Sequence, residues 1–116
     1  MTDKQIYFAF SEAANYNDID AFVSDVAISS CMEDIEIDNA LIEALKNIYE
    51  CYHMTFKDVL ERIKLSQTEF AIRYMIPLRT VQHWVNGDRA IPLYLKIMFC
   101  EIEGIWYRVK PHATEL

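Results

Sequence analysis

The stretch SQTEFAIRYMIPLRTVQHWVNGDR, from Ser66 to Arg89, determines the fold that this sequence predicts. It begins with a capping box. The Ser66 hydroxyl can accept a hydrogen bond from the first turn of a helix, and the glutamate three residues later can accept one from the serine N–H. Phe70, Ala71 and Tyr74 then form one apolar face. The first half of the stretch therefore predicts a short amphipathic helix.

A proline separates this helix from a second one. Pro77 suits the first turn of a helix, and it pushes the preceding residue, Ile76, out of the helical conformation. The second helix is expected to run to about Val85 and to end at Asn86 and Gly87, because glycine readily takes the left-handed conformation that closes a helix. Two short helices should therefore meet at a tight corner.

Two more helices flank this corner. A second capping box, at Thr55 and Asp58, predicts a helix with an apolar stripe, and a last helix should open near Pro92 and end at Gly104. The last helix is apolar nearly all round, so we expect the N-terminal half or a second copy of the chain to cover its other face.

Composition favours an all-α protein with one modest core. Hydrophobic residues make up 53% of the 116 residues, whereas the chain has two glycines and three prolines, too few for the many turns of a β-sandwich. No apolar run is long enough to cross a bilayer, and the first residues do not resemble a secretion signal. We therefore expect a cytoplasmic protein that makes no membrane contact.

The first half is acidic and mainly helical. Residues 1–54 hold two lysines and eleven acids, a net charge of −9, and residues 55–116 hold nine basic and seven acidic residues, a net charge of +2. Helices are predicted over residues 4–14 and from Asp38, while residues 18–30 fit a helix and a strand equally well. The acidic residues predict either a solvated surface that keeps the protein soluble, or a surface that binds a partner or masks the protein itself.

The basic residues are concentrated around the corner. Residues 62–89 contain five basic and two acidic side chains, so a locally positive surface exists despite the overall charge of −7. A low overall pI therefore does not exclude a polyanionic partner.

Neither cofactor nor metal is expected. Cys31, Cys51 and Cys100 are odd in number and unpaired in spacing, and they are expected to be small core residues. Cys51 and His53 lie two residues apart on a helix and therefore point to different faces, which disfavours a metal site. His53 and His112 are interpreted as ordinary polar residues. Trp106 and Tyr107 are expected to pack on a core or a second copy, or to stack on bases.

The helix after Pro77 has an apolar side and a polar side. Val81, Trp84 and Val85 should anchor it to the core, leaving residue types that contact DNA bases on the outer face. The alternative is an ordinary solvated face of a helical bundle. The predicted base-contacting residues are Arg79, Thr80, Gln82, His83 and Asn86, and the predicted contacts to the DNA backbone are Gln67, Arg73 and Arg89.

This part of the chain resembles the lambda-repressor-like, or Xre-type, helix-turn-helix family. The similar positions are Ser66, Gln67, Phe70, Ala71, Thr80, Val81, Trp84, Gly87, Arg89 and Pro92. The resemblance covers residues 55 to 105 and implies five helices, sequence-specific binding to double-stranded DNA, and a homodimer. Together with the charge division, the resemblance predicts a helix-turn-helix domain with a short tail at 55–116, preceded by an acidic, mainly helical region at 1–54 about which the family says nothing. The family usually has glycine where this chain has Met75, so either Met75 takes a left-handed backbone or the turn differs in shape.

These features of the sequence are compatible with three functions. The leading hypothesis is a dimeric DNA-binding transcriptional regulator, such as a repressor, without catalytic activity. The alternative is an antitoxin-like or phage-type inhibitor that binds a protein partner through residues 1–54. An enzyme ranks third, because no phosphate-binding loop, metal-ligand spacing or nucleophile beside a base is present in the sequence.

Overall fold

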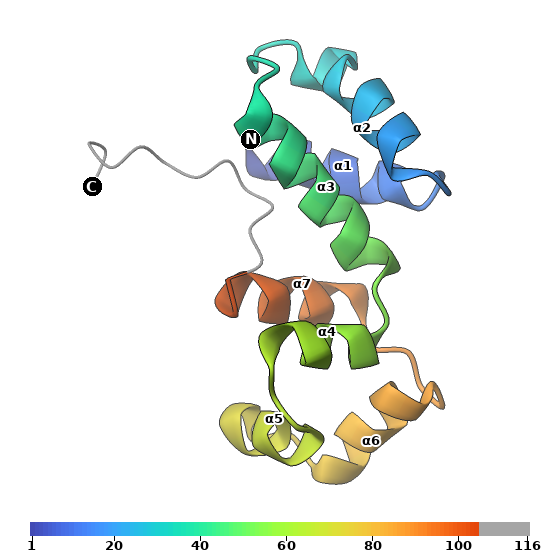
Figure 1. The fold of residues 1–116 in the computed structure, drawn as a ribbon, viewed down its shortest axis with the longest axis vertical. Helices are drawn as coiled ribbons and strands as arrows, with labels where there is room; N and C mark the ends of the chain where they lie inside the picture. Colours follow the sequence, from blue (N-terminus) through green and yellow to red (C-terminus); the bar gives the residue numbers. More distant parts are fainter. Residues whose placement is uncertain (105–116) are drawn as a thin grey trace, which may run out of the picture. The chain divides into compact units, whose positions relative to one another are not determined.

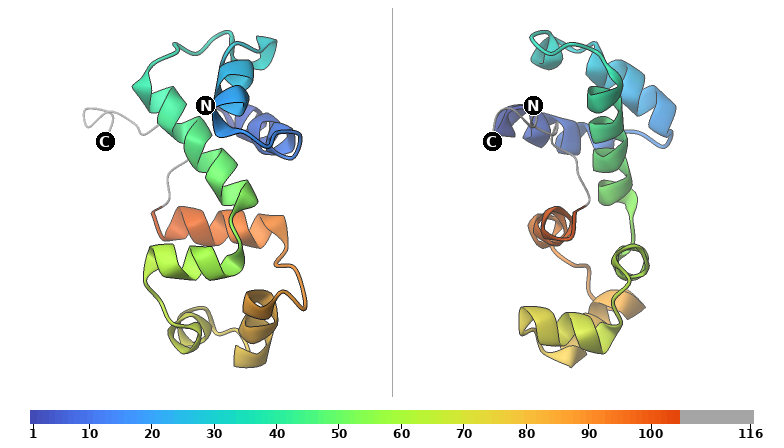
Figure 2. Two further views of the ribbon diagram at one scale, coloured as in Figure 1. Left: turned by 45° about the vertical axis from the view of Figure 1, so that its right-hand side comes forward. Right: turned by 60° about the vertical axis from the view of Figure 1, so that its left-hand side comes forward.

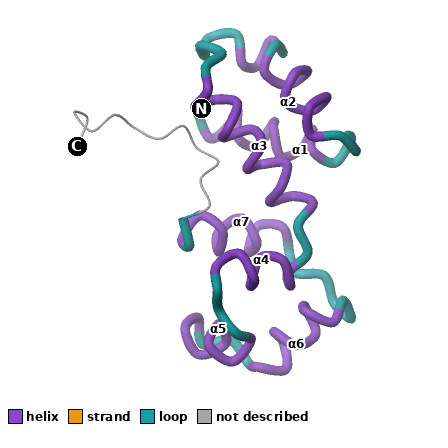
Figure 3. Tube along the Cα trace, in the orientation of Figure 1, coloured by secondary structure: helices purple, strands orange, loops and turns teal. Residues whose placement is uncertain are grey.

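The chain is all-α over the part that the structure describes. The computed structural model describes residues 1–104, in which helices are joined by loops and no strand occurs (Figures 1 and 3). The elements are α1 (Asp3–Ala13), α2 (Ile19–Ala27), the short 3-10 helix η1 (Ser30–Met32), α3 (Asn39–His53), α4 (Phe56–Ile63), α5 (Gln67–Tyr74), α6 (Leu78–Asn86) and α7 (Leu93–Ile102). The prediction of an all-α protein is confirmed.

These elements form two compact units. The first unit consists of Met1–His53, which contains α1, α2, η1 and α3. Among the described residues, it also includes Gly104. The second unit is Met54–Glu103 and contains α4 to α7.

In the first unit, α3 packs against both α1 and α2 (Figure 2). The periodicity of the sequence predicts an apolar stripe of Leu41, Leu45, Ile48 and Tyr52 on this helix; the first three are fully buried and Tyr52 is partly buried. Asp38 accepts a hydrogen bond from the Leu41 N–H at 2.9 Å, which satisfies a free donor at the start of this helix. Asp18 caps α2 in the same way, and the residues that fitted a helix and a strand equally form a helix.

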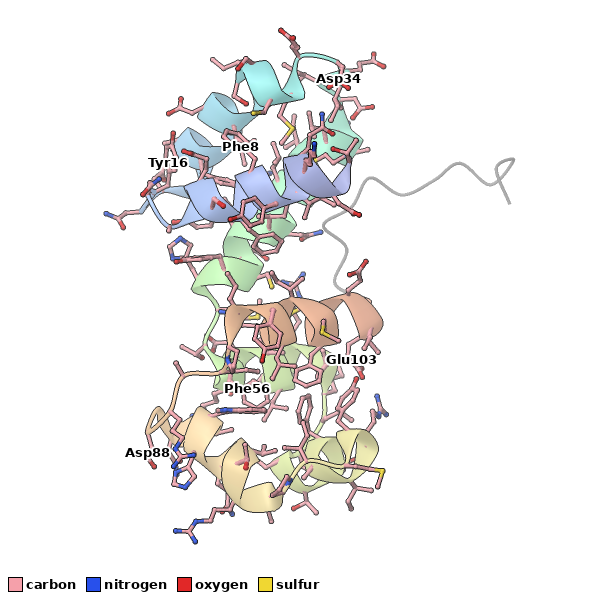
Figure 4. All side chains as sticks on the ribbon, turned by 180° about the vertical axis from the view of Figure 1, so that it is seen from behind. Phe8, Tyr16, Asp34, Phe56, Asp88 and Glu103 are labelled. Atoms are coloured by element: carbon pink, nitrogen blue, oxygen red, sulfur yellow. The ribbon has the colours of Figure 1, made fainter. Side chains whose placement is uncertain are left out.

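A buried amide fixes the 3-10 segment to α1. The side-chain nitrogen of Gln5 donates to the Cys31 carbonyl at 3.0 Å and to the Asp34 carboxylate at 2.8 Å (Asp34 is labelled in Figure 4). These bonds satisfy a polar group that would be costly to bury alone. The expectation that Cys31 is a core residue is wrong, because the single turn of η1 buries Met32 and leaves Cys31 exposed. Cys51 and Cys100 are buried as predicted.

An aromatic core joins the four helices of the second unit. The Phe56 ring of α4 (labelled in Figure 4) meets the rings of Phe70 and Trp84 edge to face, at centroid distances of 5.1 and 5.4 Å. Phe70 in turn meets Phe99 of α7 at 4.8 Å. Edge-to-face pairs of this kind contribute about 0.5–1.5 kcal/mol beyond simple burial. These contacts connect α4 with α5 and α6, and α5 with α7.

Both predicted capping boxes are present, at Thr55 with Asp58 and at Ser66 with Glu69. The expectation of five helices over residues 55 to 105 is wrong for the described residues 55–104, which contain four. The physical reason is that this stretch contains four helix starts, two at capping boxes and two at prolines, Pro77 and Pro92.

Two residues other than glycine adopt the left-handed conformation at helix ends. Met75, at φ 53°, ends α5, and Lys64, at φ 60°, ends α4. Of the two alternatives for the turn, Met75 therefore takes the left-handed backbone. This conformation costs a residue with a Cβ about 1–2 kcal/mol. The cost at Met75 is not offset by burial, because the residue is 91% exposed.

Replacing Met75 by glycine should therefore stabilise the protein. We expect Met75→Gly to raise the free energy of unfolding by about 1 kcal/mol, since glycine avoids the left-handed strain and little buried surface is lost. Chemical denaturation of the full chain measures this change. Ile72→Gly is the matched control: Ile72 is also exposed and lies on the same helix, in right-handed geometry, so its replacement should destabilise by about 1 kcal/mol. Equal signs for the two variants would contradict the interpretation.

Candidate nucleic-acid interface

The corner between α5 and α6 is three residues long, from Met75 to Pro77. Ser66 and Glu69 exchange two hydrogen bonds of 3.0 Å at the start of α5. At its end the Ile76 N–H donates to the Ala71 carbonyl at 3.0 Å, and Pro77 takes the N-cap position of α6. Local hydrogen bonds therefore fix both ends of α5, and Pro77 marks the start of α6 through its restricted backbone.

The inner face of α6 is seated in the core. Val81 is fully buried, while Trp84 and Val85 are partly buried and pack against the same hydrophobic cluster. The anchoring role predicted for these three residues is confirmed. Phe56 holds the Trp84 ring edge to face, so the rotation of α6 about its axis is fixed by packing.

The outer face of α6 carries exposed polar side chains. Arg79, Gln82 and Asn86 are exposed, at spacings of three and four residues, and Thr80 is partly buried. Positions three and four residues apart lie on one helix face. Three of the five predicted base-contacting residues thus share an accessible surface.

His83 differs from these residues. Its side chain retains 30% exposure, and its Nδ1 lies 3.2 Å from the carboxylate of Asp88 (labelled in Figure 4). Gly87, at φ 81°, ends α6 and turns the chain so that Asp88 can reach back to the helix. His83 therefore closes the loop after α6, and only part of its ring faces outward.

The three predicted backbone-contacting residues have unlike surroundings. Gln67 is partly buried at the first position of α5, and Arg89 is exposed in the loop after α6. Arg73, at the end of α5, lies 2.7 Å from a Glu103 oxygen. The charge of Arg73 is therefore balanced within the unit, whereas the Arg79 and Arg89 side chains form no ion pair among the described residues.

Glu103 connects the ends of α5 and α7. The same carboxylate oxygen accepts a hydrogen bond from the Tyr74 hydroxyl. This bond, together with the bond and the charge of Arg73, lowers the pKa of Glu103. Burial, with the bond to Glu103 second, raises the pKa of Tyr74 to about 12. Sequence patterns could not reveal this cluster, because its members lie about 30 residues apart.

Leu78 is a surface residue that the sequence reasoning missed. It is the first residue of α6 and is 40% exposed, directly beside Arg79. The available signal was its position immediately after Pro77, at the leading end of the helix.

Several expectations concern residues outside this surface. The Nε2–H of His53 donates a 2.9 Å hydrogen bond to the Ala13 carbonyl oxygen. Among residues 1–104, no three histidine, cysteine, aspartate or glutamate side chains are grouped so that they could hold a metal ion. Over the same residues, every helix is too short or too polar to cross a bilayer. Trp106, Tyr107 and His112 lie outside the described residues.

Comparison with protein families, with characterised proteins and with solved structures finds no match to this chain. The candidate interface is therefore described from the positions and exposure of its own residues.

Acid should weaken the second unit through Glu103. Its pKa is lowered by folding, so its contribution is complete above the ordinary value of 4.5 and is lost as the pH falls through the lower pKa of the folded protein. We expect Glu103→Gln to reduce the loss of stability between about pH 5 and pH 3, measured by denaturation of the full chain at each pH. Glu61→Gln, which changes an exposed glutamate of α4, should keep the acid dependence of the parent protein. Identical acid dependence in all three proteins would contradict this role of Glu103.

Proposed function

We propose that this protein is a sequence-specific DNA-binding transcriptional regulator that places α6 in the major groove. The observation that carries the proposal is the division of α6 into two faces. Val81 and Trp84 hold one face in the core, and Arg79, Gln82 and Asn86 stand on the other. Two short helices joined by a three-residue turn, with the second helix presenting polar groups, have the layout of a helix-turn-helix motif.

The chemistry of the outer face supports this choice. Arginine can form a forked pair of hydrogen bonds to guanine, and glutamine or asparagine a similar pair to adenine. Arg89 and Lys64 are exposed in the loops that follow α6 and α4, and such charges attract phosphates and displace counterions. Resemblance to the Xre-type family supports the same function, with a dimer that contacts two half-sites about one DNA turn apart.

DNA binding should be strongly salt-dependent and should depend on α6. A duplex selected from a random pool should bind the full chain, and in fluorescence polarisation the logarithm of the affinity should fall linearly with the logarithm of salt concentration. Arg79→Ala and Gln82→Ala should each weaken binding about tenfold, because each removes a contact to a base.

Lys57→Ala is the matched control for the loss of charge. Lys57 is exposed on α4, a helix that carries none of the predicted DNA-contacting residues, so its removal should change the affinity less than twofold. A flat salt response, or full affinity in both α6 variants, would refute the proposed function.

An inhibitor that binds a protein through the first unit is the second candidate. Ten of its eleven acidic residues are exposed, since Glu12 alone is partly buried, and Tyr7 and Ile28 add exposed apolar surface at 77% and 75%. A surface that combines many carboxylates with apolar side chains suits a basic protein partner. This function does not require DNA binding by α6.

Capture from a host lysate distinguishes the two functions. An inhibitor should retain a stoichiometric partner that is lost when exposed acids are neutralised together, as in Asp20→Asn with Glu33→Gln and Glu36→Gln. Such changes act through reduced charge complementarity and should leave the fold intact, because all three residues are exposed. A regulator without a protein partner should retain no such protein, while Arg79→Ala should not affect capture in either case.

A further inference from the structure

Large apolar side chains are exposed around the corner that presents α6. Ile72, Met75 and Leu78 are 73%, 91% and 40% exposed. Met75 also holds the strained left-handed backbone, which glycine would adopt without strain. Strain and apolar exposure at one place often accompany a binding function.

Leu78 has the most informative position of the three. It is the first residue of α6 and directly precedes Arg79. In helix-turn-helix proteins the first residues of the second helix approach the edges of the base pairs. In the major groove, thymine offers an apolar group at its edge, the C5-methyl, and aliphatic side chains recognise it by contact.

We infer that Leu78 packs against a thymine methyl group, with Met75 extending the apolar contact, so that the bound DNA must carry thymine opposite the leading end of α6. The inference rests on the proposed function and names a feature of its ligand. It assigns specificity to a residue that cannot form hydrogen bonds through its side chain.

The neighbours of Leu78 favour DNA over a protein as the occupant of this surface. Arg79 lies beside it, and the outer face continues with Gln82 and Asn86, so Leu78 is the one exposed apolar residue of α6, whose other apolar side chains are buried or partly buried. The major groove of DNA is similar, because a thymine methyl group there lies among many hydrogen-bond donors and acceptors of the base edges. The centre of a protein interface is instead depleted of charge and more continuously apolar.

Replacement of thymine by deoxyuracil tests the inference with the unmodified protein. A duplex selected from a random pool is resynthesised with each thymine replaced in turn, which removes one methyl group and retains all hydrogen-bonding atoms. Replacement of thymine at one position, or at two positions in a site for a dimer, should weaken binding about fourfold, because each replacement removes one buried methyl group. Equal affinity for every substituted duplex would overturn the inference.

Two leucine variants then identify the contacting residue. Leu78→Ala should bind the thymine duplex about as weakly as the parent binds the uracil duplex, and should no longer distinguish the two. Leu93→Ala is a close control, because Leu93 is also the first residue of a helix, follows the N-cap proline of α7 and is 38% exposed. It should keep the full fourfold preference for thymine.

The outcomes separate this inference from the proposed function. If Leu78→Ala retains the preference for thymine, another residue contacts the methyl group and the inference fails. Salt-dependent binding that is weakened by Arg79→Ala but is insensitive to the replacement of thymine by uracil overturns the inference and leaves the proposed function standing. If no duplex can be selected, both fail.

Discussion

The edge-to-face contacts of Phe56 are the interaction on which the second unit depends. This ring meets Phe70 of α5 and Trp84 of α6, so a single side chain of α4 determines how both helices of the corner are seated. Phe56 is 4% exposed and Phe70 is fully buried, and burial of an aromatic ring of this size contributes several kcal/mol. Because Trp84 is held from the inside, the polar side chains of α6 face outward.

The outer surface of the corner contains features that lower the stability of the fold and also groups that can bind a ligand. Met75 adopts a strained left-handed backbone at the turn and exposes an apolar side chain to solvent. Arg79 forms no ion pair among the described residues. Arg73, by contrast, forms an ion pair with Glu103. Cations at the two ends of the corner therefore differ in role: the Arg73 charge joins α5 to α7, and the Arg79 charge remains available to the ligand of the proposed function.

The two units also differ in their electrostatics. The first carries ten exposed acids, and the second carries four exposed arginines, of which Arg79 lies on α6 and Arg89 in the loop after it. An acidic first unit repels polyanions, so in the proposed function it would limit nonspecific DNA binding and increase the dependence on specific base contacts. The same charge would serve the alternative function as the contact surface for a basic protein.

Local chemistry in the sequence determined where most helices begin and end. The hydroxyl and carboxylate pairs at Thr55 and Ser66 satisfy backbone donors within four residues, and Pro77 and Gly87 act through their own backbone angles. The anchoring of Val81 and Trp84 was also predictable, because an apolar stripe at helical spacing has to be buried. The family resemblance overestimated the number of helices, since the described residues 55–104 contain four starts.

Tertiary structure alone decided which polar side chains remain accessible. The pairing of Arg73 with Glu103 spans 30 residues and joins the ends of two helices. Sequence periodicity places a residue on a face, but it cannot show whether another segment supplies a partner for its charge. The left-handed backbone of Met75 and the exposure of Leu78 were decided in the same way, because both depend on how tightly α5 and α6 meet.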